Sequence, residues 1–137
     1  IEQALDDTAR EFAERGNLRV LLHSEPLAFT LSATEQIHLL QIAREALSNC
    51  ARHAQASQAW VHLRQCGENV ELLVEDDGID IDPAFDSRHH HGLNIMQERA
   101  RSLGGSLALT PREPLGTRVR LLFCPEFLRQ PTPEALS

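Results

Sequence analysis

The feature that most constrains the fold is a helical pattern in residues 41–54, which read QIAREALSNCARHA. Apolar side chains recur at helical spacing within this stretch and just before it, at Leu39, Leu40, Ala43, Leu47, Cys50 and Ala54. Polar side chains recur three or four residues apart on the other side, at Gln41, Glu45, Asn49 and Arg52. Because side chains at these spacings share a helix face, the pattern predicts an amphipathic helix that packs one face on a core.

The polar face of this helix carries groups that suit a magnesium-phosphate ligand. Glu45 and Asn49 lie one turn apart and can address one point in a cleft, and Arg52 extends the same stripe. An Asn oxygen is a hard ligand for Mg²⁺, a Glu can polarise water or accept a proton, and an Arg can bond phosphate oxygens bidentately. The alternative is that the three side chains form an ordinary solvated helix face.

Length and charge exclude some classes of protein. The 137 residues suffice for one domain with a core, and a second domain would be cramped. The net charge is -7 and the 13 basic residues are dispersed along the chain. Because nucleic-acid backbones require clustered Lys and Arg, we expect no nucleic-acid partner.

Cysteine usage and hydropathy indicate the compartment. Cys50, Cys66 and Cys124 are odd in number and show no CxxC spacing, which predicts a reducing compartment with neither a disulfide framework nor a zinc site. No apolar run reaches membrane-spanning length, and no signal-peptide pattern opens the chain. Since Ile1 already reads as part of a helix, we expect the chain to be a piece of a longer protein.

The remaining patterns predict alternating helices and strands. Ser32 followed by Glu35 forms a capping box before the long helix. The predicted helices are 2–15, 33–54 and 92–103, and the predicted strands are 18–23, 59–65, 69–75, 106–110 and 117–123. Residues 81–91 have no usable period and are expected to be a loop, and residues 125–137 a loosely held tail. Two antiparallel hairpins with helices on one face predict an α+β fold, a two-layer α/β sandwich.

Three features outside the long helix also suit a nucleotide. Asp76 ends a predicted strand with a carboxylate that can accept a hydrogen bond from an exocyclic amine, and Gly78 lets a ring approach the backbone. Gly92 is expected at a helix N-terminus, where its amide and that of Leu93 could hold phosphates. Thr117 starts the last strand with a hydroxyl that could support the carboxylate. The alternatives are a plain Asp-Gly turn and a plain glycine N-cap.

In this order, the features resemble the nucleotide-binding domain of the GHKL superfamily, shared by sensor histidine kinases and gyrase-type ATPases. The resemblance covers about residues 1–124. It rests on Glu45 and Asn49 for the N box, Asp76 and Gly78 for the G1 box, Gly92 for the G2 box, and Gly116 with Thr117 for the final element. The runs REALSN at 44–49 and GLNIMQERA at 92–100 are similar to kinases that pair with NarL-type response regulators. The run at 38–49, with FCPE at 123–126, is most similar to nitrate/nitrite sensor kinases.

The resemblance implies a Bergerat-type catalytic domain that binds ATP and Mg²⁺ and delivers the γ-phosphate to a histidine on a separate dimerisation helix. Asp76 would bind the adenine amine, and Gly78 would admit the base. Asn49 would ligate Mg²⁺, and Glu45 would act near the phosphoryl group as a polarising or base residue. The other implied cofactor-binding positions are Arg52, His53, Asp80, Gly92, Leu93 and Thr117. His53 has the alternative of a packed histidine at a helix end.

Two positions depart from the family pattern or lack a role in it. Asp80 stands where the G1 box usually has a second glycine, and its charge and Cβ are expected to weaken ATP binding about tenfold. The histidines of residues 89–91 are expected to be a solvated loop rather than a metal site, because consecutive residues rarely converge on one ion.

None of the seven histidines stands in the family's acceptor context, so the phosphorylated histidine is expected upstream of Ile1. The resemblance implies a homodimer anchored in the bacterial inner membrane, with this domain in the cytoplasm and a NarL-type response regulator downstream. Two alternatives stay open. One is a degenerate nucleotide-binding interaction module, which Asp80 makes conceivable, and the other is a serine kinase of the anti-sigma-factor type.

Overall fold

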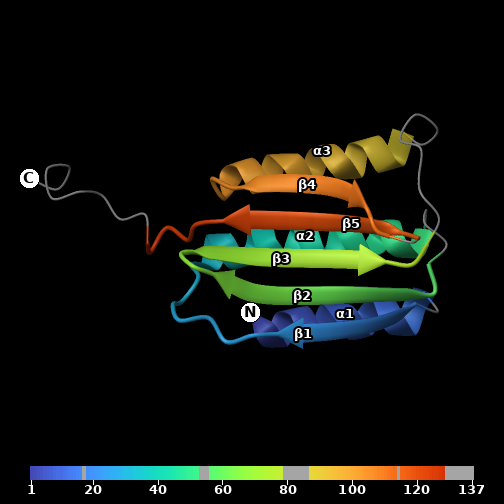
Figure 1. Cartoon of the computed structure of the whole chain (residues 1–137), viewed down its shortest axis with the longest axis horizontal. Helices are drawn as coiled ribbons and strands as arrows, with labels where there is room; N and C mark the ends of the chain where they lie inside the picture. The colour runs from blue at the N-terminus through green and yellow to red at the C-terminus, as the bar shows by residue number, and fades with distance from the viewer. Residues whose placement is uncertain (17, 53–55, 79–86, 114, 129–137) are drawn as a thin grey trace, which may run out of the picture.

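The computed structural model describes residues 1–16, 18–52, 56–78, 87–113 and 115–128. The elements in chain order are α1 (Glu2–Gly16), β1 (Arg19–Ser24), α2 (Ala33–Arg52), β2 (Gln58–Cys66), β3 (Asn69–Asp76), α3 (Ser87–Ser102), β4 (Ser106–Pro111) and β5 (Thr117–Phe123) (Figure 1). Their types and order agree with the sequence prediction, and most boundaries differ by one or two residues. No helix in the described ranges is long and apolar enough to cross a membrane.

The strands form one mixed sheet with the order β1-β2-β3-β5-β4. The predicted hairpins β2–β3 and β4–β5 are antiparallel, and β3 pairs antiparallel with β5, so that Val74 lies between Val61 and Val119. The edge strand β1 runs parallel to β2, with Leu22 opposite Val61. A parallel pair needs a long crossover, and α2 lies in the connection between these two strands.

The helices cover one face of the sheet, and the other face is open (Figure 1). Figure 1 views the open face, with α1, α2 and α3 behind the strands. The core fills the space between the layers, and its buried members include Leu39, Ile42, Ala43, Leu47, Val61, Leu63, Val70, Leu72, Val74, Met96, Leu121 and Phe123. The predicted two-layer α/β sandwich, mainly antiparallel, is therefore confirmed.

The predicted capping box opens α2 and also ties the end of the domain to it. The Ser32 hydroxyl accepts from the Glu35 amide at 3.1 Å, and the Ser32 amide donates to Glu35 Oε1 at 2.9 Å. The second Glu35 oxygen accepts from the Glu126 amide at 2.8 Å. The buried Glu35 carboxylate thus joins the first turn of α2 to the chain after β5, and residues 129–137 of the predicted tail lie outside the described residues.

The start of α3 corrects the sequence prediction. The helix was expected to open at Gly92, but it begins at Ser87, so residues 87–91 of the predicted loop are helical and Gly92 lies inside the helix. The free amides of a helix are those of its first turn, so Gly92 and Leu93 do not supply them here. The prediction failed because apolar periodicity marks only the packed part of a helix, and the buried Met96 and Ala100 lie beyond the first turn.

Candidate functional site

A small cavity of about 40 Å³ lies between α2 and the sheet, at the end where β3 finishes and β5 starts. Side chains from α2, β3, β4 and β5 line it, and they are Ala46, Asn49, Cys50, Val74, Asp76, Leu109, Thr117 and Val119. The walls are mostly apolar, with a few polar groups among them. In ligand pockets, apolar walls of this kind take the rings and polar groups set the orientation, but the volume of this cavity admits only a few waters.

Asp76 is the buried carboxylate of this cavity, with only 4% of its surface exposed. Its Oδ1 accepts from the Gly78 amide at 2.8 Å, and its Oδ2 accepts from the Cys50 thiol at 3.3 Å. Burial and then the nearby charge of Asp76 raise the pKa of Cys50 well above its usual value, so the thiol stays protonated and can donate. Among the described residues, no basic side chain forms an ion pair with Asp76. Its charge is held by neutral donors.

The neighbouring Asp77 holds the strand end that carries Asp76. Its Oδ1 accepts from the amides of Ser57 and Gln58 at 3.0 and 2.9 Å, and its Oδ2 accepts from the Ser57 hydroxyl at 2.7 Å. Burial opposes ionisation, but these hydrogen bonds outweigh it and lower the pKa of Asp77. Asp77 is not among the site residues predicted from the sequence. The repeated Asp before Gly78 was the available signal, but its partners at the start of β2 follow only from the fold.

Gly116 makes room for the same strand end. Its φ is +118°, and a Cβ built on it would lie 1.8 Å from the Asp76 carbonyl oxygen. A side chain here would therefore push β5 away from β3 directly beside the cavity. The predicted pairing of Gly116 and Thr117 has a physical cause, because the glycine permits the close approach that lets Thr117 line the cavity.

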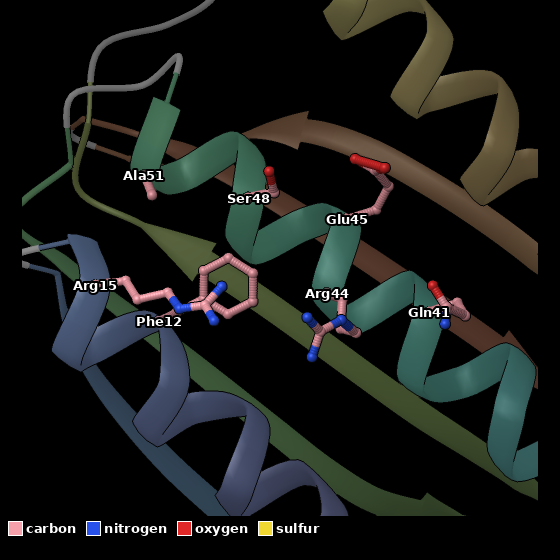
Figure 2. Close-up of a pocket in the computed structure, with 7 residues that line it drawn as sticks. All are labelled: Phe12, Arg15, Gln41, Arg44, Glu45, Ser48 and Ala51. Atoms are coloured by element: carbon pink, nitrogen blue, oxygen red, sulfur yellow. The ribbon is translucent and has the colours of Figure 1, made fainter.

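The predicted pair on α2, Glu45 and Asn49, lies together beneath α3. A Cβ added to Gly92 would lie 3.0 Å from Glu45 Oε2 and 3.7 Å from Asn49 Oδ1. The two oxygens therefore face the same point on α3, and the missing side chain at Gly92 leaves them space. Figure 2 shows the Glu45 carboxylate rising from α2 on the side of α3. Asn49 also lines the cavity that contains Asp76, so the polar face of α2 and the buried carboxylate form one continuous site.

A larger groove of about 490 Å³ lies on the other side of Glu45, between α1 and α2 (Figure 2). Its lining residues are Phe12, Arg15, Gln41, Arg44, Glu45, Ser48 and Ala51. Arg44 lies 5.7 Å over the Phe12 ring and bonds Glu11 at 2.7 Å, and this bond is the main cause that lowers the pKa of Glu11. Glu45 thus lines the groove, and Asn49, one turn further along α2, lines the cavity.

The structure brings most of the predicted site residues together, namely Glu45, Asn49, Asp76, Gly78, Gly92 and Thr117. Arg52 is the last residue of α2, and its side chain lies outside what the structure describes. His53 and Asp80 lie outside the described residues, as do the side chains of the predicted histidine run at 89–91. In the described part of the chain, no cluster of three or more His, Cys, Asp or Glu side chains could hold a metal by itself.

Residues 34–126 match the family model of the histidine kinase-, DNA gyrase B-, and HSP90-like ATPases. The chain belongs to this family. Among its relatives, the nitrate/nitrite sensor protein NarX of Escherichia coli K12 is 36% identical over 126 residues, which are 92% of this chain and 21% of NarX. NarQ of the same organism is 42% identical over 94 residues, which are 68% of this chain and 17% of NarQ. The chain therefore spans about a fifth of the length of these relatives, and residues 34–126 form its ATPase domain.

Solved structures show the same fold. The ATP-binding domain of PrrB from Mycobacterium tuberculosis superposes with a TM-score of 0.72 at 21% identity, over 90% of this chain and 91% of that domain. The catalytic domain of the histidine kinase ThkA gives a TM-score of 0.70 at 12% identity, over 90% and 92% of the two chains. The predicted family resemblance is confirmed, and membership of the family implies ATP binding.

Proposed function

We propose that this domain binds ATP with Mg²⁺ and transfers the γ-phosphate to a histidine on a separate dimerisation helix. The observation that carries the proposal is the buried Asp76 carboxylate, whose hydrogen-bond donors among the described residues are neutral. It lies in a cavity that Asn49 also lines, and the Asn49 oxygen lies close to that of Glu45. One end of this site suits an adenine ring, and the other suits phosphates with a cation.

Asp76 is proposed to accept the exocyclic amine of adenine. A carboxylate offers about four lone-pair positions, and the Gly78 amide and the Cys50 thiol use one on each oxygen. Acceptor capacity therefore remains for an amine, and Thr117 lies in the same cavity to support it. Val74, Val119 and Leu109 provide apolar surface for the ring, and the buried Gly78 adds no side chain to obstruct it.

Asn49 and Glu45 are proposed to serve the phosphate end. Their oxygens fit a hard cation that keeps several waters and takes its remaining ligands from phosphates, which is how Mg²⁺ is commonly held. When bound, Mg²⁺ neutralises phosphate charge during transfer. Asn49 would hold the ion, and Glu45 would polarise or accept the proton of the attacking nucleophile. Arg52 and His53 stay proposed phosphate-side residues. Gly92 is proposed to leave space for the phosphates beside Glu45 and Asn49 rather than to donate its amide, and no phosphate contact is proposed for Leu93, whose amide lies inside α3. Asp80 stays a proposed source of weaker binding.

The nucleophile is proposed to come from outside this chain, because none of its seven histidines stands in an acceptor context. The groove between α1 and α2 leaves Glu45 open to such an approach (Figure 2). The likeness to the nitrate/nitrite sensor proteins NarX and NarQ supports a role in sensing nitrate and nitrite. We further propose that the whole protein is a homodimer in the bacterial inner membrane, with this domain in the cytoplasm. Its phosphoryl group would pass to a NarL-type response regulator.

Phosphotransfer tests the proposal. With labelled ATP and Mg²⁺, we expect the isolated domain not to label itself but to label a supplied dimerisation helix of its own kinase. Asn49→Asp and Glu45→Ala should suppress the transfer, because phosphoryl transfer depends on positioning and charge stabilisation. Acid-labile phosphate on the isolated domain would contradict the placement of the acceptor. Acid-stable label on a protein serine would instead support the serine-kinase alternative, and no ATP binding at all would support the degenerate module.

A further inference from the structure

Cys50 is a cavity residue that the adenine assignment leaves without a role. It follows Asn49 on α2, is 3% exposed, and lines the cavity beside Asp76. The other cysteines, Cys66 and Cys124, are half-buried and do not line this cavity. Cys50 therefore differs from Cys66 and Cys124 both in its burial and in its place in the cavity wall.

The bond between Cys50 and Asp76 fixes one half of the carboxylate. The Gly78 amide holds Oδ1 at 2.8 Å from within the same turn, but the only hydrogen bond to Oδ2 from a described residue comes from the Cys50 thiol, at 3.3 Å. A carboxylate held through one oxygen can still rotate about its side-chain bonds, whereas donors on both oxygens define its plane. Since α2 carries the thiol and β3 the carboxylate, this bond also links the two elements that form the cavity.

We propose that Cys50 is a positioning residue that holds the Asp76 carboxylate in the orientation that recognises the purine amine, and so contributes to the preference for adenine. The inference rests on the proposed adenine role of Asp76. Cys50 acts through Asp76, so its contribution exists only when the ligand carries an amine for Asp76 to bind. The thiol hydrogen, which points to Asp76 Oδ2, is the donor that this role needs.

The test compares two nucleotides that differ only in the amine. Dissociation constants for ATP and for purine riboside triphosphate, which lacks the 6-amino group, are measured by titration calorimetry on the wild type, Cys50→Ala and Cys50→Ser. We expect Cys50→Ala to bind ATP about fivefold more weakly, with little change for the analogue, because only the amine contact depends on the carboxylate orientation. Cys50→Ser keeps a donor and should retain most of the preference for ATP. Cys66→Ala, at a cysteine outside the cavity, is the matched control and should change neither constant.

The outcomes separate this inference from the function on which it rests. Equal weakening of both nucleotides in Cys50→Ala would show that the residue only packs, and would overturn the inference while leaving the adenine pocket in place. Unchanged binding of both nucleotides would overturn it as well. If the wild type binds ATP and the analogue equally, or binds neither, the adenine role of Asp76 is wrong and the role of Cys50 fails with it.

Discussion

Two buried carboxylates on β3 have opposite surroundings. Glu71 is 1% exposed and Asp76 is 4% exposed, and their odd separation along the strand places them on opposite faces of the sheet. Glu71 lies on the open face, where Arg64 and Arg120 each donate to one of its oxygens at 2.5 Å. Asp76 lies on the helix face, where an amide and a thiol are its donors.

The difference shows which carboxylate is available to a ligand. Burial opposes the ionisation of Glu71, but its hydrogen bonds to Arg120 and Arg64 outweigh burial and lower its pKa. Two guanidinium groups of the protein itself compensate the Glu71 charge, so this residue contributes to stability. Asp76 has no such compensation among the described residues, and its remaining lone pairs face a cavity. The comparison predicts that changes at Glu71 affect folding, and that changes at Asp76 affect binding.

The largest expected effect comes from Gly116→Ala, which should disturb both folding and ATP binding. Its Cβ would lie 1.8 Å from the Asp76 carbonyl oxygen, so β5 and the end of β3 would have to separate. We expect a loss of about 3 kcal/mol or more in the free energy of unfolding, measured by urea denaturation, and loss of ATP binding in calorimetry. Gly67→Ala is the control, because Gly67 also has a positive φ but nothing lies within 4 Å of its Cβ position. A cost of about 1 kcal/mol is expected there. Equal costs at the two glycines would contradict the crowding argument.

Asp76→Asn should weaken ATP binding about tenfold to a hundredfold with little change in folding. The amide cannot provide charge-assisted acceptance from the adenine amine, and the loss of such a bond costs about 1.5 to 3 kcal/mol. Calorimetry measures the affinity, and urea denaturation checks that the variant is folded. Equal affinity of the wild type and Asp76→Asn would remove the adenine assignment.

Glu71→Gln should do the reverse and lower stability while ATP affinity is kept. The variant loses the charge of two hydrogen-bonded ion pairs, but Arg64 and Arg120 are about half exposed and can be hydrated again. We therefore expect a loss of about 1 to 2 kcal/mol in the free energy of unfolding, below the cost for a fully buried pair. If this variant lost ATP binding while its stability stayed unchanged, the contrast between the two carboxylates would be wrong.

The smallest expected effect is a pH dependence of the stability that Glu71 contributes, which tests whether its charge is the cause. The pKa of Glu71 is lower in the folded state than in the unfolded state, where it is about 4.5. Its contribution to the free energy of unfolding is therefore present above the unfolded pKa and is lost as the pH falls through the folded pKa. The difference in stability between the wild type and Glu71→Gln should therefore shrink as urea denaturation is repeated from pH 7 down to pH 3. Glu68→Gln, at an exposed turn residue, should show no such convergence. A gap that stays constant with pH would show that the loss in Glu71→Gln comes from packing.

Local patterns in the sequence were sufficient to predict most of the helices and strands and the main motif residues of the site. The periodicity of residues 33–52, the capping box of Ser32 and Glu35, and the two alternating hairpins predicted the elements, because they depend on residues near one another in the chain. The same holds for the motif residues Glu45, Asn49, Asp76 and Thr117, whose order along the chain indicated one nucleotide site. The structure brings these side chains together, and their roles stay predictions.

Tertiary structure alone decided the features that depend on residues distant in sequence. The parallel pairing of β1 with β2 and the start of α3 at Ser87 had no signal in the local period. The alternation of β3 predicts for Glu71 only that its side chain points away from the core. The periodicity of α2 predicts for Cys50 only that it is a small apolar core residue. Only the fold places Arg120 beside Glu71 and the Cys50 thiol beside Asp76. The physical reason is that a side chain's hydrogen-bond partners are set by which elements pack together, and periodicity records only which face a residue takes.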